Sequence, residues 1–157
     1  MTRWLSRPEQ RAWRGLLQMA TRLEAQLNRE LQEASGLSLA DYDVLVPLSE
    51  APQGRLRVFE LASDLRWERS RLSHHLTRMQ RRGLIAREDC DDDRRGAFVV
   101  LADAGRAAIT QAAPAHVESV RRLVFDGMSS AQVRSLHALT ESVLARLDAA
   151  REPRPTA

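Results

Sequence analysis

Arginine side chains gather in the middle of this sequence, where they could bind a polyanion. Between Arg66 and Arg82 there are six arginines and a single acid, Glu68. The whole chain carries a net charge of only +3, and all 24 of its basic side chains are arginine. A basic segment within a near-neutral chain favours a polyanionic partner, since guanidinium groups bind phosphate oxygens strongly. A solvated helix face is the alternative explanation for such a charge run.

A second cluster is acidic, in the stretch REDCDDDRRG that begins at Arg87. A metal site is disfavoured there because acids adjacent in sequence rarely converge and the glycine spacing of a calcium loop is missing. His74 and His75 point about 100° apart on a helix and cannot share one metal ion. The sequence has no nucleophile–base signature, phosphate loop or cofactor fingerprint. We therefore expect neither a metal nor a cofactor, and no enzymatic activity.

The arginines of the middle segment lie on a predicted helix from about Glu68 to Arg82 that ends at Gly83. Leu72, Leu76 and Met79 form its narrow apolar stripe. The side chains expected on its polar face are Ser70, Arg71, Ser73, His74, Thr77 and Arg78. Short hydroxyls and arginine suit the base edges of a DNA major groove, whereas arginines at the helix ends suit phosphates. The predicted phosphate contacts are Arg66, Arg69, Arg81 and Arg82.

The elements around this helix predict a mainly α fold with a small β-hairpin. Serine followed three residues later by an acid or amide marks three helix starts, at Ser6, Ser38 and Ser129. The chain should begin with a helix of roughly 27 residues ending at Gly36, followed by a helix from Ser38 that Pro47 bends or shortens. A short strand at Arg55–Arg57 and a short helix through Val58, Leu61 and Leu65 then lead to the arginine-rich helix. After it we expect strands at Ile85–Asp89 and Ala97–Leu101, a helix from Asp103 to Gly127 kinked at Pro114, and a last helix. Helix, turn, helix and hairpin together make a winged helix-turn-helix.

Two segments resemble the MarR family of multiple-antibiotic-resistance regulators. LSHHLTRMQRRGLIAR, from Leu72 to Arg87, is similar to the recognition helix of that family, and DRRGAFVVLADAGR, from Asp93 to Arg106, is similar to its wing. The resemblance implies that Asp93 holds the wing loop and that Arg95 reaches into the minor groove, with Arg94 near phosphate. Ala102 departs from the threonine usual before the fifth helix. His75 stands where the family often has an apolar residue, and we expect it to be half-buried with one hydrogen bond.

The resemblance also implies a homodimer and a small-molecule effector, often an aromatic or phenolic compound. Trp13, Leu17 and Tyr42 could line an effector pocket with Arg14 near a carboxylate, although aromatic residues at such spacing are more often core. Sensing of oxidants is disfavoured because the only cysteine, Cys90, lies among aspartates that should keep its thiol protonated. Zinc sensing is disfavoured because His116 has only Ala112 and Val120 one turn away.

These features predict a sequence-specific regulator of transcription that binds double-stranded DNA at a pseudo-palindromic operator, a homodimeric repressor released by an effector. The alternatives are an architectural or coating DNA-binding protein and a winged helix that contacts another protein. We expect a single domain over residues 1–157, with dimerisation helices at 1–36 and 103–150, a DNA-binding lobe at 38–101 and a tail at 151–157. A single cysteine and the lack of a long apolar run favour a cytoplasmic protein without membrane contact.

Overall fold

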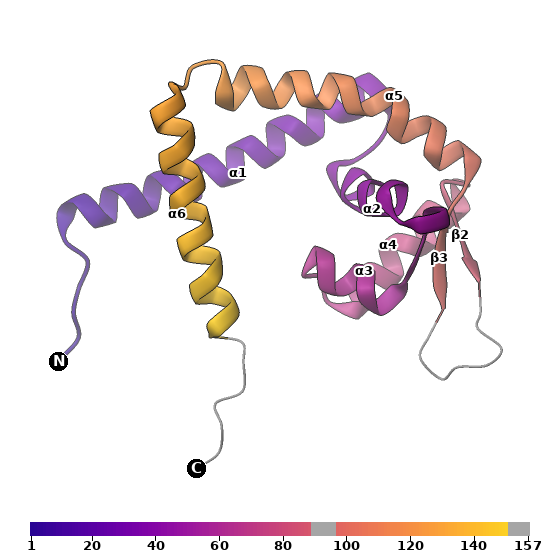
Figure 1. The fold of residues 1–157 in the computed structure, drawn as a ribbon, viewed down its shortest axis with the longest axis horizontal. Coiled ribbons are helices and arrows are strands. Elements are labelled where there is room, and N and C mark those ends of the chain that lie inside the picture. Colours follow the sequence, from indigo (N-terminus) through magenta and orange to yellow (C-terminus); the bar gives the residue numbers. More distant parts are fainter. Residues whose placement is uncertain (89–96, 151–157) are drawn as a thin grey trace, which may run out of the picture. The chain divides into compact units, whose positions relative to one another are not determined.

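The computed structural model describes residues 1–88 and 97–150, which are mainly helical with one small sheet (Figure 1). The helices and strands are α1 (Arg7–Ser35), α2 (Leu39–Glu50), β1 (Arg55–Arg57), α3 (Val58–Leu65), α4 (Arg69–Arg81), β2 (Ile85–Glu88), β3 (Phe98–Leu101), α5 (Asp103–Val120) and α6 (Ser130–Ala149). Residues up to Ser119 form one compact unit, and residues from Val120 onward form another. The predicted fold class is confirmed.

The three predicted helix starts are confirmed as capping boxes. Before α1, the Ser6 hydroxyl accepts from the Glu9 backbone N–H, and the Glu9 carboxylate accepts from the Ser6 N–H at 2.7 Å. Ser38 and Ser129 do the same for α2 and α6. Gly36 ends α1 with a φ of 71°, a left-handed conformation that glycine adopts without strain. Local sequence therefore sets where these helices begin and where α1 ends.

One prediction about the proline-containing helices needs correction. Pro47 lies near the end of α2, as predicted, and this helix stops three residues later at Glu50. The helix expected to run from Asp103 to Gly127 ends as α5 at Val120, and a π-helical turn over Arg121–Phe125 follows it. Pro114 lies inside α5.

The sheet is antiparallel in the order β1–β3–β2. β3 pairs with β1 in the register Arg55↔Val100 and with β2 in the register Ile85↔Leu101. This confirms the predicted hairpin and the predicted short strand. α5 follows β3 after the single residue Ala102, and a side chain at Gly105 would collide with the backbone carbonyl of Leu84.

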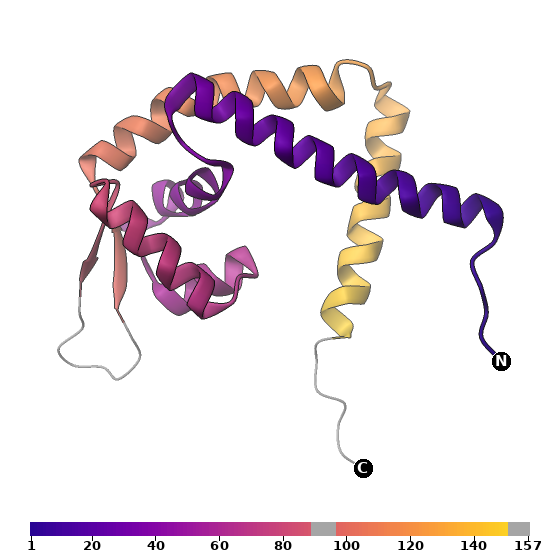
Figure 2. The same cartoon turned by 180° about the vertical axis from the view of Figure 1, so that it is seen from behind.

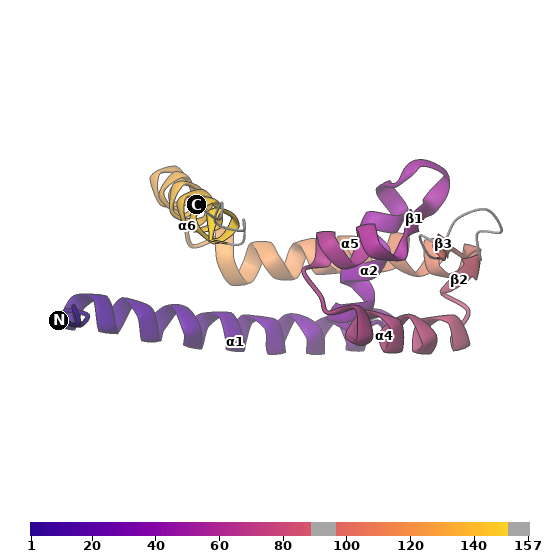
Figure 3. The same ribbon diagram turned by 90° about the horizontal axis from the view of Figure 1, so that it is seen from below.

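The core lies in a lobe formed by α2, α3, α4 and the sheet, joined by the end of α1 and the start of α5 (Figures 1 and 2). Its largest fully buried side chains are mostly leucines: Leu31, Leu37, Leu45, Leu48, Leu61, Leu72, Leu76, Met79, Val44 and Val99. The first half of α1 extends beyond this lobe (Figure 3). No helix in the described residues is both long enough and apolar enough to span a membrane.

Candidate nucleic-acid interface

α4 has one buried face and one exposed face, as its sequence predicts. Leu72, Leu76 and Met79 are fully buried, and His75 lies among them. The exposed side chains on the other face are Ser70, Arg71, Ser73, His74 and Arg78. Thr77 is half-buried, and its hydroxyl donates to the Ser73 carbonyl at 2.9 Å. The helix thus presents hydroxyl, imidazole and guanidinium groups along one accessible side.

Two arginines on this side are held by neighbouring groups. The Arg71 guanidinium lies 4.2 Å from the centre of the Trp67 ring, a cation–π contact. Arg87 of β2 donates to the Ser73 carbonyl at 2.7 Å and so connects the hairpin to α4. Sequence reasoning did not single out Trp67 or Arg87, because both contacts depend on how the elements pack.

His75 differs from its expectation. It is 6% exposed rather than half-buried. It makes one hydrogen bond, as expected, and has a second polar contact with a carboxylate. Its Nε2 lies 3.1 Å from Asp41 Oδ1, and its Nδ1 lies 2.8 Å from Arg78 Nη2. The Trp67 ring packs edge-on against the imidazole at 5.5 Å between centres.

The arginines predicted to bind phosphate fall into two groups. Arg66, Arg69 and Arg81 are exposed, and Arg66 adopts a left-handed backbone at the end of α3. Arg82 is exposed too, but its guanidinium donates to Asp41 Oδ2 at 2.7 Å and to the Gly36 carbonyl at 3.0 Å. Its guanidinium therefore has a structural role that the sequence did not reveal.

Burial alone would raise the pKa of Asp41, whose residue is 2% exposed. Hydrogen bonds from His75, Arg82 and Ser38 outweigh burial and hold the pKa of this carboxyl well below its ordinary value. Asp41 is therefore a buried carboxylate that stays ionised at neutral pH.

The base of the hairpin carries a further pair of arginines. Arg55 and Arg57 of β1 lie 4.0 and 4.6 Å from the centre of the Phe98 ring, and Arg55 also pairs with Glu88 at 3.3 Å. The wing residues Asp93, Arg94 and Arg95, together with Cys90, lie outside the described residues. Among the described residues, no group of three or more His, Cys, Asp or Glu could hold a metal ion.

The four residues predicted for an effector pocket do not meet in one hollow of this chain. Arg14 and Leu17 line an open hollow on α1 with Gln18, Thr21 and Arg22. Tyr42 instead packs on His116, with ring centres 4.4 Å apart. The start of α2 lies beside Asn28 of α1, whose side chain accepts from the Leu39 N–H. Trp13 lies about 22 Å from Asn28 along α1, at 1.5 Å per residue, and is therefore far from α2.

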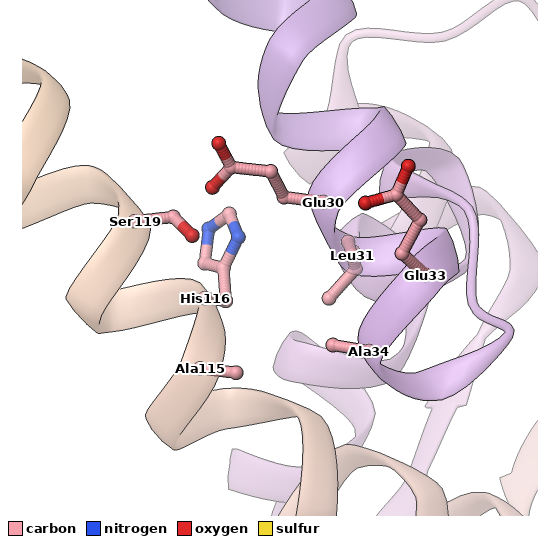
Figure 4. A pocket seen from close by; sticks show the side chains of 7 residues that line it. All are labelled: Glu30, Leu31, Glu33, Ala34, Ala115, His116 and Ser119. Carbon is pink, nitrogen blue, oxygen red and sulfur yellow. The ribbon is translucent and has the colours of Figure 1, made fainter.

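A different hollow, of about 360 Å³, lies between the C-terminal ends of α1 and α5 (Figure 4). It is lined by Glu30, Leu31, Glu33, Ala34, Ala115, His116 and Ser119. The Glu30 carboxylate points toward the His116 imidazole, and Glu33 lies on the other side of Leu31. Burial lowers the pKa of His116, although the Asp43 charge opposes this shift. Sequence reasoning named none of the acidic residues at this hollow.

A helix–turn–helix followed by a β-hairpin, with a polar recognition face, defines the winged helix-turn-helix class. A sequence model of the MarR family matches residues 35–96. AbsC, a MarR family transcriptional regulator from Streptomyces coelicolor, is 40% identical, with a TM-score of 0.88 over 94% of this chain and 99% of AbsC. Sco3205, from the same organism and solved in complex with DNA, is also 40% identical, with a TM-score of 0.90 over 99% of this chain and 96% of its own.

A more distant structure shares the fold. A mutant of MarR from E. coli, complexed with operator DNA, is 23% identical, with a TM-score of 0.74 over 83% of this chain and 91% of MarR. A search of curated protein sequences found no match. On the family model and the two 40% identical structures, the chain belongs to the MarR family of transcriptional regulators. Both of these relatives are described as transcriptional regulators.

Proposed function

We propose that this protein is a homodimeric transcription regulator that binds a pseudo-palindromic DNA operator and acts as a repressor. The observation that carries the proposal is α4, whose buried leucine face leaves a continuous polar and basic face accessible. Sco3205, 40% identical, was solved in complex with DNA, which supports the same role here. A helix of this kind reads base edges in the major groove with the residues of its exposed face.

The proposed division of labour follows the chemistry of each side chain. Ser70, Ser73, His74 and Arg78 face the bases, with Arg71 and Thr77 completing this face. Arg66, Arg69 and Arg81 contact phosphates, which gives affinity without sequence choice. Arg82 is left out of this set because its guanidinium already binds Asp41 and Gly36. Asp93, Arg94 and Arg95 are proposed as the wing contacts from the resemblance alone, with Arg95 in the minor groove.

Exposed apolar side chains support the homodimer. On α1, Trp13, Leu16, Leu17 and Met19 are exposed, and on α6 Val133, Leu139, Val143, Leu144 and Leu147 are exposed. A single soluble chain rarely leaves so many large apolar side chains in water, and a second copy would bury them. The two copies of α4 would then enter successive major grooves about 34–36 Å apart.

The proposed regulation is release by a small aromatic or phenolic effector. The hollow between α1 and α5 is its proposed site, because α1 carries exposed apolar residues and its C-terminal end, which lines the hollow, packs into the lobe that carries α4. Glu30 and Glu33 at this hollow disfavour an anionic ligand, so we expect the effector to carry no net negative charge. The effector can change DNA binding only if it binds two conformations of the protein with different affinities.

Fluorescence anisotropy on two duplexes tests the function. One duplex carries the region immediately upstream of the coding sequence, and the other has random sequence of equal length. A regulator binds the first at least about 10³-fold more tightly at physiological salt. A ratio near one indicates a coating protein, and no binding even at low salt indicates a winged helix that contacts another protein.

Residue contributions are separable with the same assay. Arg95→Ala should weaken binding while leaving the sedimentation coefficient of the protein unchanged. Arg81→Ala should weaken binding to both duplexes and reduce the slope of log K against log salt by about 1, as expected for a phosphate contact. Unchanged affinity of Arg95→Ala would refute the minor-groove assignment.

A further inference from the structure

Asp41 is a buried carboxylate that connects the recognition helix α4 to the joint between α1 and α2. It occupies the third position of α2, and its Oδ2 accepts from the Ser38 N–H at 2.9 Å. The same oxygen accepts from Arg82 Nη1 at 2.7 Å, and Oδ1 lies 3.1 Å from His75 Nε2. Arg82 and His75 both lie more than 30 residues away from Asp41 in the sequence.

The partners of His75 determine where its proton lies. A guanidinium has only donors, so Nδ1 must accept from Arg78 Nη2, 2.8 Å away, with its lone pair. The neutral imidazole then carries its proton on Nε2, the nitrogen that faces the Asp41 carboxylate. The contacts therefore run in one direction: Arg78 donates to His75 Nδ1, and the Nε2–H of His75 faces Asp41 Oδ1 at 3.1 Å as a polar contact without an aligned hydrogen bond.

This chain of contacts joins the interior of the lobe to its exposed face. Asp41 and His75 are 2% and 6% exposed, whereas Arg78 is exposed on the side of α4 that we assign to DNA. The imidazole is also fixed by the edge-on contact with Trp67. A free arginine samples many rotamers, and one that is already held loses less entropy when it binds.

Stability alone is a weak reason for this arrangement. Well-packed apolar residues in place of a buried ion pair are often as stabilising or more so, because charges must give up their hydration to be buried. Asp41 also has a cationic partner in Arg82, whose Nη1 lies 2.7 Å from Oδ2. The contact between His75 and Arg78 adds orientation at a place where orientation matters for binding.

We propose that Asp41 and His75 are positioning residues that hold Arg78 in a fixed orientation for DNA recognition. The inference rests on the proposed function and extends it, because it assigns sequence readout to residues that do not touch DNA. Arg78 keeps its remaining N–H groups for a base edge while one of them is held by His75.

A pair of substitutions at His75 separates orientation from packing. In His75→Asn the side-chain oxygen can occupy the place of Nδ1 and accept from Arg78. In His75→Gln the amide reaches instead toward Asp41, and no acceptor remains at the place of Nδ1. Both variants lose the imidazole ring and its contact with Trp67. They differ in which contact they keep: Asn keeps the acceptor for Arg78, and Gln keeps the contact with Asp41.

The experiment is a double-mutant cycle on DNA affinity, with the upstream duplex and the random duplex as probes. His75→Gln should weaken binding to the upstream duplex about tenfold, within the range of one lost arginine–base contact. His75→Asn should bind more tightly than His75→Gln. In the Arg78→Ala background the difference between Gln and Asn should vanish, since the group they position is gone.

Gln80→Ala, an exposed position of α4 with no assigned role, is the matched control, and thermal unfolding checks that each variant is folded. If the difference between Gln and Asn persists without Arg78, or is absent with it, the inference is overturned while the proposed function stands. If the wild-type protein does not distinguish the upstream duplex from the random one, the proposed function fails and this inference fails with it.

Discussion

The lobe around α4 and the long helices differ in where their leucines lie. In the lobe, Leu45, Leu48, Leu72 and Leu76 are fully buried within one chain. On α6, Leu139, Leu144 and Leu147 are 53–57% exposed, and the first half of α1 is similar. Both regions have the periodic apolar pattern of amphipathic helices, so the pattern alone does not say whether the partner is the same chain or another. The lobe buries its leucines within one chain, whereas the long helices leave theirs exposed.

The largest expected effect is on the lobe. Leu45→Ala removes a fully buried side chain from α2 and should lower the free energy of unfolding by about 2–5 kcal/mol. Because the site is inside one chain, the loss should be the same at low and high protein concentration. Urea denaturation at two concentrations measures it. A loss below about 1 kcal/mol would mean that the lobe repacks around the cavity.

The next effect concerns association. Leu144→Asp on α6 places a charge on the face that we assign to the partner chain, and its burial there would be costly. We expect the dimer dissociation constant to rise about 30-fold or more, as for a central interface residue. Sedimentation across a concentration series measures this change. Ser135→Asp, an exposed polar position of α6, is the control, and equal effects of the two variants would contradict the assignment.

A third prediction concerns how the free energy of unfolding depends on pH in acid. The pKa of Asp41 is depressed in the folded protein, so its contribution to stability is fully present above the ordinary carboxyl pKa of about 4. That contribution is lost as the pH falls from about 4 through the lower folded pKa, because the unfolded chain takes up the proton first. Asp41→Asn should therefore flatten the decline of the unfolding free energy in this window. A wild-type slope retained by the variant would show that other carboxyls cause the decline.

The smallest effect compares two caps. Ser38→Ala should destabilise the lobe by about 1 kcal/mol, because Ser38 caps α2 beside the half-buried joint with α1. Ser6→Ala removes a similar cap from the exposed start of α1 and should leave the unfolding of the lobe almost unchanged. Hydrogen exchange of the α1 and α2 amides distinguishes the two sites. Equal losses of protection in α2 would show that α1 and the lobe unfold together.

Most of the fold follows from local sequence. Capping serines, the glycine after α1 and the two apolar periodicities predict the helices and the hairpin, since each signal depends on neighbouring residues. The exposed side of α4 follows from the same periodicity. The end of α5 was missed, because nothing in the sequence near Val120 indicates a change to a π-helical turn.

The contacts that support the site were harder to predict. Arg82 looked like a phosphate ligand, yet its partner Asp41 lies 41 residues away in sequence. The same holds for Arg55 and Phe98, which meet only because β1 pairs with β3. Contacts of this kind are set by packing, and one sequence gives no signal for them.

The glycine at position 105 has a mechanical consequence. α5 begins one residue after β3, the Ala102 N–H donates to the Leu84 carbonyl at 3.2 Å, and the hydrogen of Gly105 is all that separates the helix from that carbonyl. The hairpin and the start of α5 are therefore in direct backbone contact, and we expect them to rotate together. A tilt of the hairpin in a DNA groove would be transmitted as torque along α5.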